Sequence, residues 1–207
     1  MVVDLLWSKI WDPSIWPKVS TFLWLLCHNK ILTWDNLRKI NFHGPSICPN
    51  CKQNEESIIH LMHHYPLAQK IWKKISFRCQ RNGGSNEVIR DTVRKWAHNP
   101  YQSKILNFLW KLIPGFVLWA IWKERNGIIF KDHTRSLEDI WKLLHQNIEE
   151  TIFLKTWYQE EFLTIPQEQS IWNNWNFQRK QDELTTGTRQ PKNHQPTQWT
   201  PPPENMF

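Results

Sequence analysis

Residues 105–122 read ILNFLWKLIPGFVLWAIW and form the most apolar stretch of a chain of 207 residues. A membrane span needs about 20 mostly apolar residues, but Asn107, Lys111 and the pair Pro114-Gly115 interrupt this stretch. We therefore interpret it as two buried helical segments that meet at Pro114-Gly115, and we expect no membrane partner. The second segment is predicted to end at Asn126-Gly127, because glycine is favoured just after a helix.

The segments before and after this stretch carry apolar side chains at helical spacing. Residues that suit a helix start, as N-caps or first-turn prolines, are Pro17, Thr33, Asn54, Pro66, Ser85 and Ser136. The helix after Asn54 is expected to run from Glu55 to about Tyr65. Residues 136–139, SLED, match a capping box. Strand signals are weak apart from residues 127–130, so the sequence predicts an all-α fold.

Tryptophan is unusually frequent, with 15 residues in the chain. Each indole buries a large apolar area but carries an N–H group that needs a hydrogen-bond partner. We therefore expect most tryptophans at half-buried positions between helices, in a small Trp-rich helical domain followed by further helices.

The composition changes after Phe162, where Gln, Asn, Thr and Pro dominate. Such a segment has too little apolar surface to offset the entropy lost on ordering. We predict a disordered Pro/Gln/Asn-rich linker at residues 163–207, preceded by a helical domain at residues 1–80 and a helical connector region at residues 81–162.

The net charge of +7 belongs to the first 163 residues, because the segment after Leu163 has equal numbers of acidic and basic side chains. Basic residues concentrate between residues 70 and 95, and a basic surface favours phosphate groups as partners. The alternative is a solvated helix face. The candidate residues for binding RNA or DNA are Lys70, Lys73, Lys74, Arg78, Arg81, Arg90, Arg94 and Lys95.

Four cysteines and a first segment without signal-peptide character indicate a reducing, intracellular compartment, either nucleus or cytoplasm. The pair Cys48-x-x-Cys51 is followed by His60 and His64, which are four residues apart and would share one helix face. Two thiolates and two imidazoles in this order suit a structural zinc site resembling a zinc knuckle. The alternatives are a chance cysteine pair beside a His-rich surface helix, or a redox CxxC motif without its usual βαβ context.

Signatures of catalysis are absent from the sequence. It contains no Walker loop, GxGxxG motif or nucleophile elbow, and no close pair of aspartates of the kind that binds two metal ions in polymerases. We therefore expect a protein that is not an enzyme.

Several motifs together resemble the zinc-binding domain that follows the polymerase in plant LINE-type (non-LTR) retrotransposon reverse transcriptases. Residues 118–130 resemble the segment that leads towards the ribonuclease H domain of this family, and Trp199–Pro203 resembles the approach to that domain, before which we expect the chain to be truncated. The N-terminal motifs that carry the resemblance are Trp7-x-x-Ile10-Trp11, Trp16-Pro17-Lys18-Val19-x-x-Phe22-Leu23-Trp24-Leu25, Ile31-Leu32-Thr33-x-Asp35-Asn36-Leu37, Cys48-Pro49-x-Cys51, Glu56-Ser57-x-x-His60-Leu61 and Pro66-Leu67-Ala68-x-x-Ile71-Trp72.

The resemblance implies zinc ligands at Cys48, Cys51 and His60. The family pattern places a further cysteine five residues after the histidine, where this chain has Tyr65. Either His64 takes the place of that ligand, or the site is degenerate.

The resulting hypothesis is a non-catalytic, retroelement-derived module with structural zinc that assists nucleic-acid binding by a reverse transcriptase. Its partners would be RNA or DNA and the polymerase and ribonuclease H portions of a retroelement protein. The alternatives are a structural spacer or scaffold without nucleic-acid contact, and a decayed retrotransposon remnant with no activity of its own.

Overall fold

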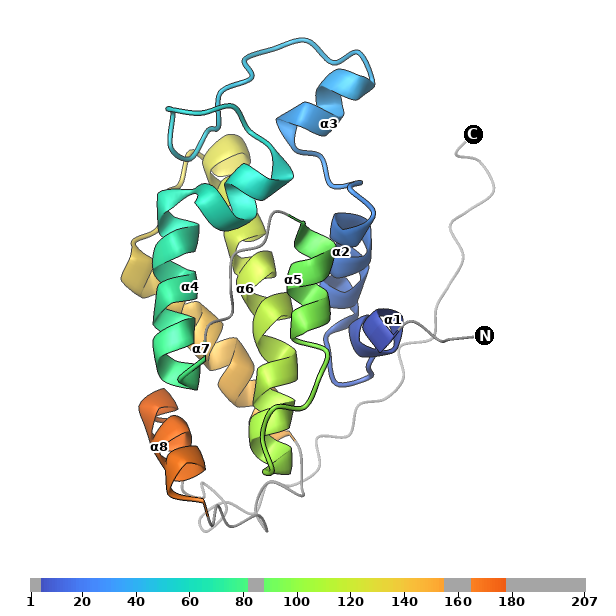
Figure 1. Ribbon diagram of the computed structural model, residues 1–207. Coiled ribbons are helices and arrows are strands. Elements are labelled where there is room, and N and C mark those ends of the chain that lie inside the picture. Colours follow the sequence, from blue (N-terminus) through green and yellow to red (C-terminus); the bar gives the residue numbers. More distant parts are fainter. Residues whose placement is uncertain (1–4, 82–87, 155–164, 178–207) are drawn as a thin grey trace, which may run out of the picture. The chain divides into compact units, whose positions relative to one another are not determined.

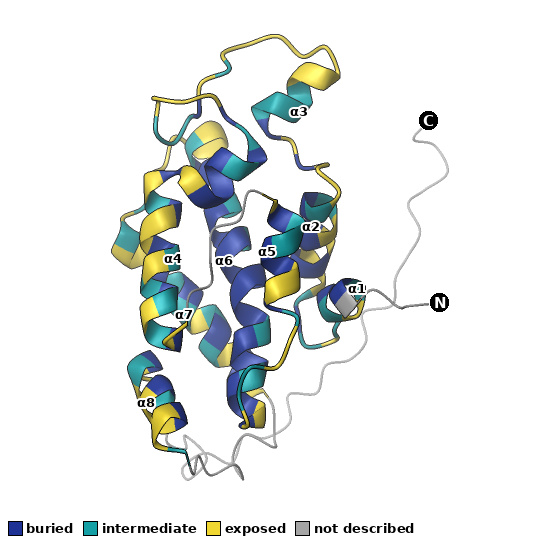
Figure 2. Cartoon of the chain, viewed as in Figure 1, coloured by how far each residue is buried: buried dark blue, intermediate teal, exposed yellow. Residues whose placement is uncertain are grey.

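The long helix α6 (Lys104–Lys131) lies at the centre of the fold, and the other helices pack around it (Figure 1). The computed structural model describes residues 5–81, 88–154 and 165–177, which belong to one compact unit. Helices α2, α4, α5 and α7 all contact α6. Because these neighbours cover it on several sides, α6 is buried along most of its length (Figure 2).

The prediction of two segments meeting at Pro114-Gly115 was wrong, because α6 continues through this pair as one helix. Proline removes one helical hydrogen bond, but the tight packing around α6 holds the helix together. Gly115 lies against α2: a Cβ atom there would come within 3.1 Å of Val19 and 3.2 Å of Leu23. The glycine therefore lets the two helices approach closely.

The predicted end of this helix at Asn126-Gly127 was also wrong. The helix continues to Lys131, so residues 127–130 are helical and form no strand. It ends at Asp132, which adopts a left-handed conformation with φ of 45°. Within the described residues, α6 has the length and composition of a membrane span, but 78% of its most apolar stretch is buried inside the fold. The apolar sequence is thus explained by the core that α6 forms.

The remaining helices confirm the all-α prediction, since residues 5–81, 88–154 and 165–177 contain only an isolated bridge between Ile47 and Glu55 outside helices and loops. Several predicted starts are confirmed: α2 and α4 begin at proline, and the Ser136 hydroxyl accepts a hydrogen bond from the Asp139 amide. The bounds are α1 (Leu5–Ile10), α2 (Pro17–Cys27), α3 (Trp34–Lys39), η1 (His60–His64), α4 (Pro66–Cys79), α5 (Ile89–Lys95), α7 (Leu137–Phe153) and α8 (Pro166–Trp175).

Helix α8 lies inside the segment predicted to be disordered from residue 163, so that prediction was wrong for residues 166–175. The helix buries Ile171 and Trp175 and contacts α4. The Glu168 carboxylate accepts hydrogen bonds from the backbone amides of Gln102 and Ser103, at 2.8 and 3.1 Å. These contacts hold α8 at the start of α6. The remainder of the predicted tail, residues 178–207, lies outside the described residues.

Tryptophan side chains join several of the helices, as their number suggested. Trp72 is half-buried, and its indole donates a hydrogen bond of 2.9 Å to the carbonyl of Met62. Trp96 and Trp110 are fully buried instead, with stacked rings whose centroids lie 3.8 Å apart. The predicted boundary at residue 80 does not separate two cores, because α6 also contacts α2 and η1.

Candidate metal centre

Cys48, Cys51 and His60 lie together, with their potential ligand atoms all within 4.8 Å of one another. The Cys51 thiol is 3.3 Å from Nε2 of His60. Cys48 and His60 are buried, and Cys51 is half-buried. The structure thus brings together three of the four zinc ligands predicted from the sequence.

A tight turn positions the two cysteines. The Cys48 amide donates to the carbonyl of Asn54 at 2.8 Å, and the Lys52 amide donates to the carbonyl of Cys48 at 2.9 Å. Lys52 adopts a left-handed conformation with φ of 55°, which reverses the chain. The two thiols therefore lie on one side of a short loop, as ligands of one ion require.

The surroundings of the two thiols differ. Burial raises the pKa of Cys48 to about 11, although the backbone of Cys51 and Asn50 acts in the opposite direction. Burial also acts to raise the pKa of Cys51, but hydrogen bonds from the backbone of Gln53 and Asn54 outweigh it and lower this pKa. Backbone amides directed at sulfur stabilise a thiolate, which is the form that binds a metal.

The histidine comes from η1, a turn of π-helix rather than the predicted α-helix from Glu55 to Tyr65. The Tyr65 amide donates a hydrogen bond of 2.7 Å to the carbonyl of His60, five residues earlier. Because a π-turn contains one residue more than an α-turn, it brings position 65 towards the side occupied by His60. Burial lowers the pKa of His60, which favours the neutral imidazole that a metal binds.

Tyr65 lies beside the two thiols. Its side chain is 9% exposed. Burial raises the pKa of Tyr65, and the charges of Glu124, Cys48 and Cys51 act in the same direction. The position where the family pattern has a cysteine is therefore buried and lies close enough to the cysteine pair for their charges to act on it.

His64, the predicted substitute ligand, lies outside the group formed by Cys48, Cys51 and His60. Its side chain is exposed. The neighbouring His63 is buried and lies 3.1 Å from the Thr92 hydroxyl of α5. The structure therefore does not bring the imidazole of His64 to the three other predicted ligands.

A buried ion pair connects the segment before His60 to helix α6. The Glu56 carboxylate binds the Arg125 guanidinium of α6 through two hydrogen bonds, of 2.8 and 2.9 Å. The same carboxylate accepts a hydrogen bond of 2.8 Å from the Trp34 amide at the start of α3. Sequence reasoning missed this link, although Glu56 and Arg125 both lie in motifs that carry the family resemblance.

The donor set fits zinc. Two thiols and an imidazole are ligands that zinc prefers, and structural zinc sites are four-coordinate. Cys48, Cys51 and His60 would hold the ion, which would supply no chemistry beyond crosslinking the turn to η1. A phenol is a harder and poorer zinc ligand than a thiolate. Tyr65 at the fourth position would therefore bind zinc more weakly than the cysteine of the family pattern.

The eight predicted nucleic-acid-binding residues lie on or next to α4 and α5 and differ in their exposure. Lys70 and Lys73 are exposed on α4, and Arg94 and Lys95 are exposed on α5. Arg94 also forms an ion pair of 2.7 Å with Asp91. The other four contact residues farther away in the sequence: Lys74 lies 4.4 Å from the Trp141 ring centre, Arg78 bonds to the carbonyl of Asn174, Arg81 bonds to the carbonyl of Pro100, and Arg90 lies 5.2 Å from the Trp7 ring centre.

Comparison with known proteins agrees with the site. Residues 2–72 match the family described as zinc-binding in reverse transcriptase. A protein of Arabidopsis thaliana named "Putative ribonuclease H protein" is 23% identical over 128 residues, which cover 61% of this chain. The aligned part spans 20% of that relative's length. No solved structure matches the chain.

The matched segment contains Cys48, Cys51 and His60, and the relative is a plant protein, as the resemblance to plant retroelements implied. Residues 2–72 thus belong to the family of zinc-binding domains in reverse transcriptases, and the similarity to the plant relative agrees with an origin in a retroelement.

Proposed function

We propose that the chain is a non-catalytic module in which zinc bound by Cys48, Cys51 and His60 stabilises the fold, and that it assists nucleic-acid binding by a reverse transcriptase. The observation that carries the proposal is the convergence of these three side chains within 4.8 Å, inside the segment that matches the zinc-binding family. Metal bound between the cysteine turn and η1 would add its binding energy to the folding energy.

The roles of the buried carboxylates support the non-catalytic part of the proposal. Glu56 binds Arg125, Glu124 accepts hydrogen bonds from the backbone and side chain of Arg135, and Glu168 binds the amides at the start of α6. Each of these carboxylates therefore has a structural role. Primer-extension and RNA-cleavage assays of the pure protein with Mg²⁺ test this part, and activity lost on substitution of a single Asp or Glu would contradict it.

The nucleic-acid part rests on exposed cations. Among the candidates, Lys70 and Lys73 stand on the exposed side of α4. Each phosphate contact contributes to the salt dependence of binding, with a slope of about 0.7 to 0.9 per neutralised phosphate. The variant Lys70→Gln/Lys73→Gln should therefore bind RNA more weakly and with a flatter salt slope. Lys142→Gln, an exposed lysine on α7, is the matched control.

Fluorescence anisotropy of a labelled RNA, titrated with protein at several salt concentrations, measures both quantities. If the wild-type protein folds cooperatively but binds no RNA or DNA, the chain is a spacer or scaffold instead. If it shows no cooperative unfolding with zinc present, the chain is a decayed remnant.

A further inference from the structure

A continuous stack of planar side chains lies where α1, α2 and α5 meet. The His28 ring stacks on Trp7 of α1 at 5.0 Å between ring centroids, and it lies 4.7 Å from the ring of Trp24 on α2. The Arg90 guanidinium of α5 lies 5.2 Å from the centre of the Trp7 ring. Trp24, at the outer end of the stack, is 40% exposed, so its indole is open to solvent.

A second exposed indole adjoins this stack. Trp11 is 52% exposed, and its amide donates to the carbonyl of Trp7, one helical turn earlier. Residues four apart lie on the same side of a helix, so Trp11, which directly follows α1, lies on the same side as Trp7. Isolated exposed apolar residues are ordinary, but two exposed tryptophans beside one aromatic stack form a shared surface.

The helices that carry this surface are strongly basic. Across α1, α2 and α5 the only acidic residue is Asp91, whereas the basic residues are Lys9, Lys18, Arg90, Arg94 and Lys95. Arg90 and Arg94 lie one turn apart, and both are near Cys27, which directly precedes His28. Burial raises the pKa of Cys27 to about 11, and the charges of these two arginines oppose that rise. Arg90 thus lies beside the stacked rings, and Arg94 follows it by one turn of α5, where it pairs with Asp91.

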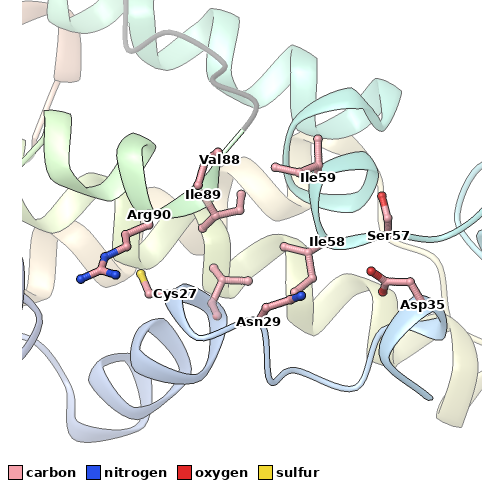
Figure 3. A pocket seen from close by; sticks show the side chains of 10 residues that line it. Cys27, Asn29, Asp35, Ser57, Ile58, Ile59, Val88, Ile89 and Arg90 are labelled. Carbon is pink, nitrogen blue, oxygen red and sulfur yellow. The ribbon is translucent and has the colours of Figure 1, made fainter. Parts of the chain in front are cut away.

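A pocket of about 270 Å³ opens next to the stack, between α2, α3, the segment before η1 and α5 (Figure 3). Arg90, which also contacts Trp7, and Cys27 lie on its wall, and Asn29, Asp35 and Ser57 supply polar groups. Its volume is slightly below the range of about 300 to 1,000 Å³ that is usual for small-molecule sites. The pocket therefore suits one small planar group.

We propose that the aromatic–basic face, formed by Trp7, Trp11, Trp24, His28, Arg90 and Arg94, binds single-stranded nucleic acid. Unpaired bases would stack on Trp24 and Trp11, phosphates would lie beside the arginines, and one base would enter the pocket. The inference rests on the proposed function and specifies its ligand, because only unpaired bases offer free ring faces to the indoles. An acidic protein segment would satisfy the charges but would leave the exposed indoles without stacking partners.

The test compares a labelled single-stranded oligouridylate with a hairpin RNA duplex of equal charge, both titrated with the full chain. Stacking of one base is worth about 1 to 3 kcal/mol, which corresponds to about 5- to 150-fold in affinity. Trp11→Leu and Trp24→Leu should each weaken single-strand binding by such a factor and leave duplex binding unchanged. Trp24→Phe keeps a flat ring and should restore most of the affinity lost in Trp24→Leu.

The matched control is Phe130→Leu, because Phe130 is 74% exposed on α6, a helix outside this face. Arg94→Gln should flatten the salt slope for the single strand by about 0.7. Circular dichroism and thermal unfolding verify that each variant is folded, and the comparison of Trp24→Phe with Trp24→Leu remains informative if Trp24→Leu is destabilised.

Three outcomes would overturn the inference. If folded Trp11→Leu and Trp24→Phe/Leu variants bind the single strand as the wild type does, or if the duplex is preferred, the face is not a stacking surface, although the proposed function stands. If polyglutamate of equal charge competes as well as the oligonucleotide, the face binds protein. If the wild type binds neither RNA, the inference and the nucleic-acid part of the proposed function fail together.

Discussion

Glu56 and Arg125 form a buried ion pair with two hydrogen bonds, of 2.8 and 2.9 Å, between residues that are 69 positions apart. Their side chains are 1% and 5% exposed, respectively. Arg125 belongs to α6, outside the segment of residues 2–72 that matches the zinc-binding family. The zinc-binding segment therefore depends on the central helix for a partner to one of its buried charges, and the two parts should unfold together.

We predict that Arg125→Met strongly destabilises the protein, because it leaves the buried carboxylate of Glu56 without its cation. Removal of one partner from a buried pair costs about 3–5 kcal/mol. Urea denaturation followed by tryptophan fluorescence measures this change. The exposed pair Arg94–Asp91 is the control, and Arg94→Met should cost less than about 1 kcal/mol. Equal effects of the two substitutions would contradict a structural role for the buried pair.

Helix α8 gives a second prediction. Trp175 is fully buried, and its ring stacks with Trp141 of α7 at 6.0 Å. Trp175→Ala should destabilise the protein by about 3–5 kcal/mol, as expected for a tryptophan removed from a core. Trp172→Ala, on the half-buried side of the same helix, should cost clearly less. Limited proteolysis should then cut the Trp175→Ala variant near residues 166–177. Resistance of these residues to cleavage would show that α8 stays folded without the Trp175 side chain.

Several features of the fold followed from local sequence. Prolines at the first turn placed the starts of α2 and α4, and the cap at Ser136 placed the start of α7. Each of these signals acts within the first helical turn, where backbone amides have no partner inside the helix. Proline has no such amide, and the serine hydroxyl accepts a hydrogen bond from one. The spacing of Cys48, Cys51 and His60 likewise predicted their proximity, because a CxxC turn fixes the two thiols by itself.

Features that depend on distant contacts were not predictable in this way. Local rules break a helix at Pro114, yet α6 continues because surrounding helices hold it. Helix α8 has few apolar residues, and it is ordered by Glu168 and Trp175 through partners far along the chain. The π-turn of η1 was missed for a related reason, since an apolar pattern does not distinguish i+4 from i+5 hydrogen bonding. That difference changes the position of residue 65 relative to His60, and His64 lies outside the cluster of predicted ligands.

Close packing between α2 and α6 gives a third prediction. A Cβ atom at Gly115 would lie 3.1 Å from Val19 and 3.2 Å from Leu23, which is tighter than ordinary contact. Gly115→Val should therefore force the helices apart and destabilise the protein by about 1–3 kcal/mol, the usual cost of overpacking. Thermal unfolding of this variant can be compared with Ile129→Val at an exposed site of α6. An unchanged or raised midpoint of thermal unfolding for Gly115→Val would show that α2 and α6 can accommodate the larger side chain without loss of stability.

A fourth prediction concerns acid. The ammonium of Lys111 on α6 lies 2.7 Å from the carboxylate of Asp12. Burial acts to raise the pKa of Asp12, but hydrogen bonds from Lys111 and Ser14 outweigh it and lower this pKa below the ordinary value of 3.8. Because the folded pKa is the lower one, the stabilisation is present above about pH 4 and is lost as the pH falls through the folded pKa.

The unfolding free energy of Asp12→Asn should therefore vary less with pH below 4 than that of the wild type. The difference should be about 1 kcal/mol or less, since both side chains remain partly exposed. Lys111→Gln should reduce the same pH dependence. The double variant Asp12→Asn/Lys111→Gln should reduce it no further than Asp12→Asn alone. Additive effects of the two substitutions would show that the groups act independently.

The last prediction concerns the fourth position of the metal centre. Cys48→Ser should abolish zinc binding and lower the unfolding midpoint, whereas Cys27→Ser, outside the cluster, should leave the zinc content unchanged. Tyr65 occupies the position where the family pattern has a cysteine, so Tyr65→Cys should complete a ligand set of three thiolates and one imidazole. Zinc affinity should rise by at least about tenfold, the lower bound for changes in the surroundings of a site. His64→Ala should have little effect, because His64 is exposed and outside the cluster.

Metal content after dialysis, and competition with a chromogenic chelator, measure these differences. Zinc loss in His64→Ala without any gain in Tyr65→Cys would assign the fourth ligand to His64, and absence of zinc from both the wild type and Tyr65→Cys would show that the site no longer binds metal.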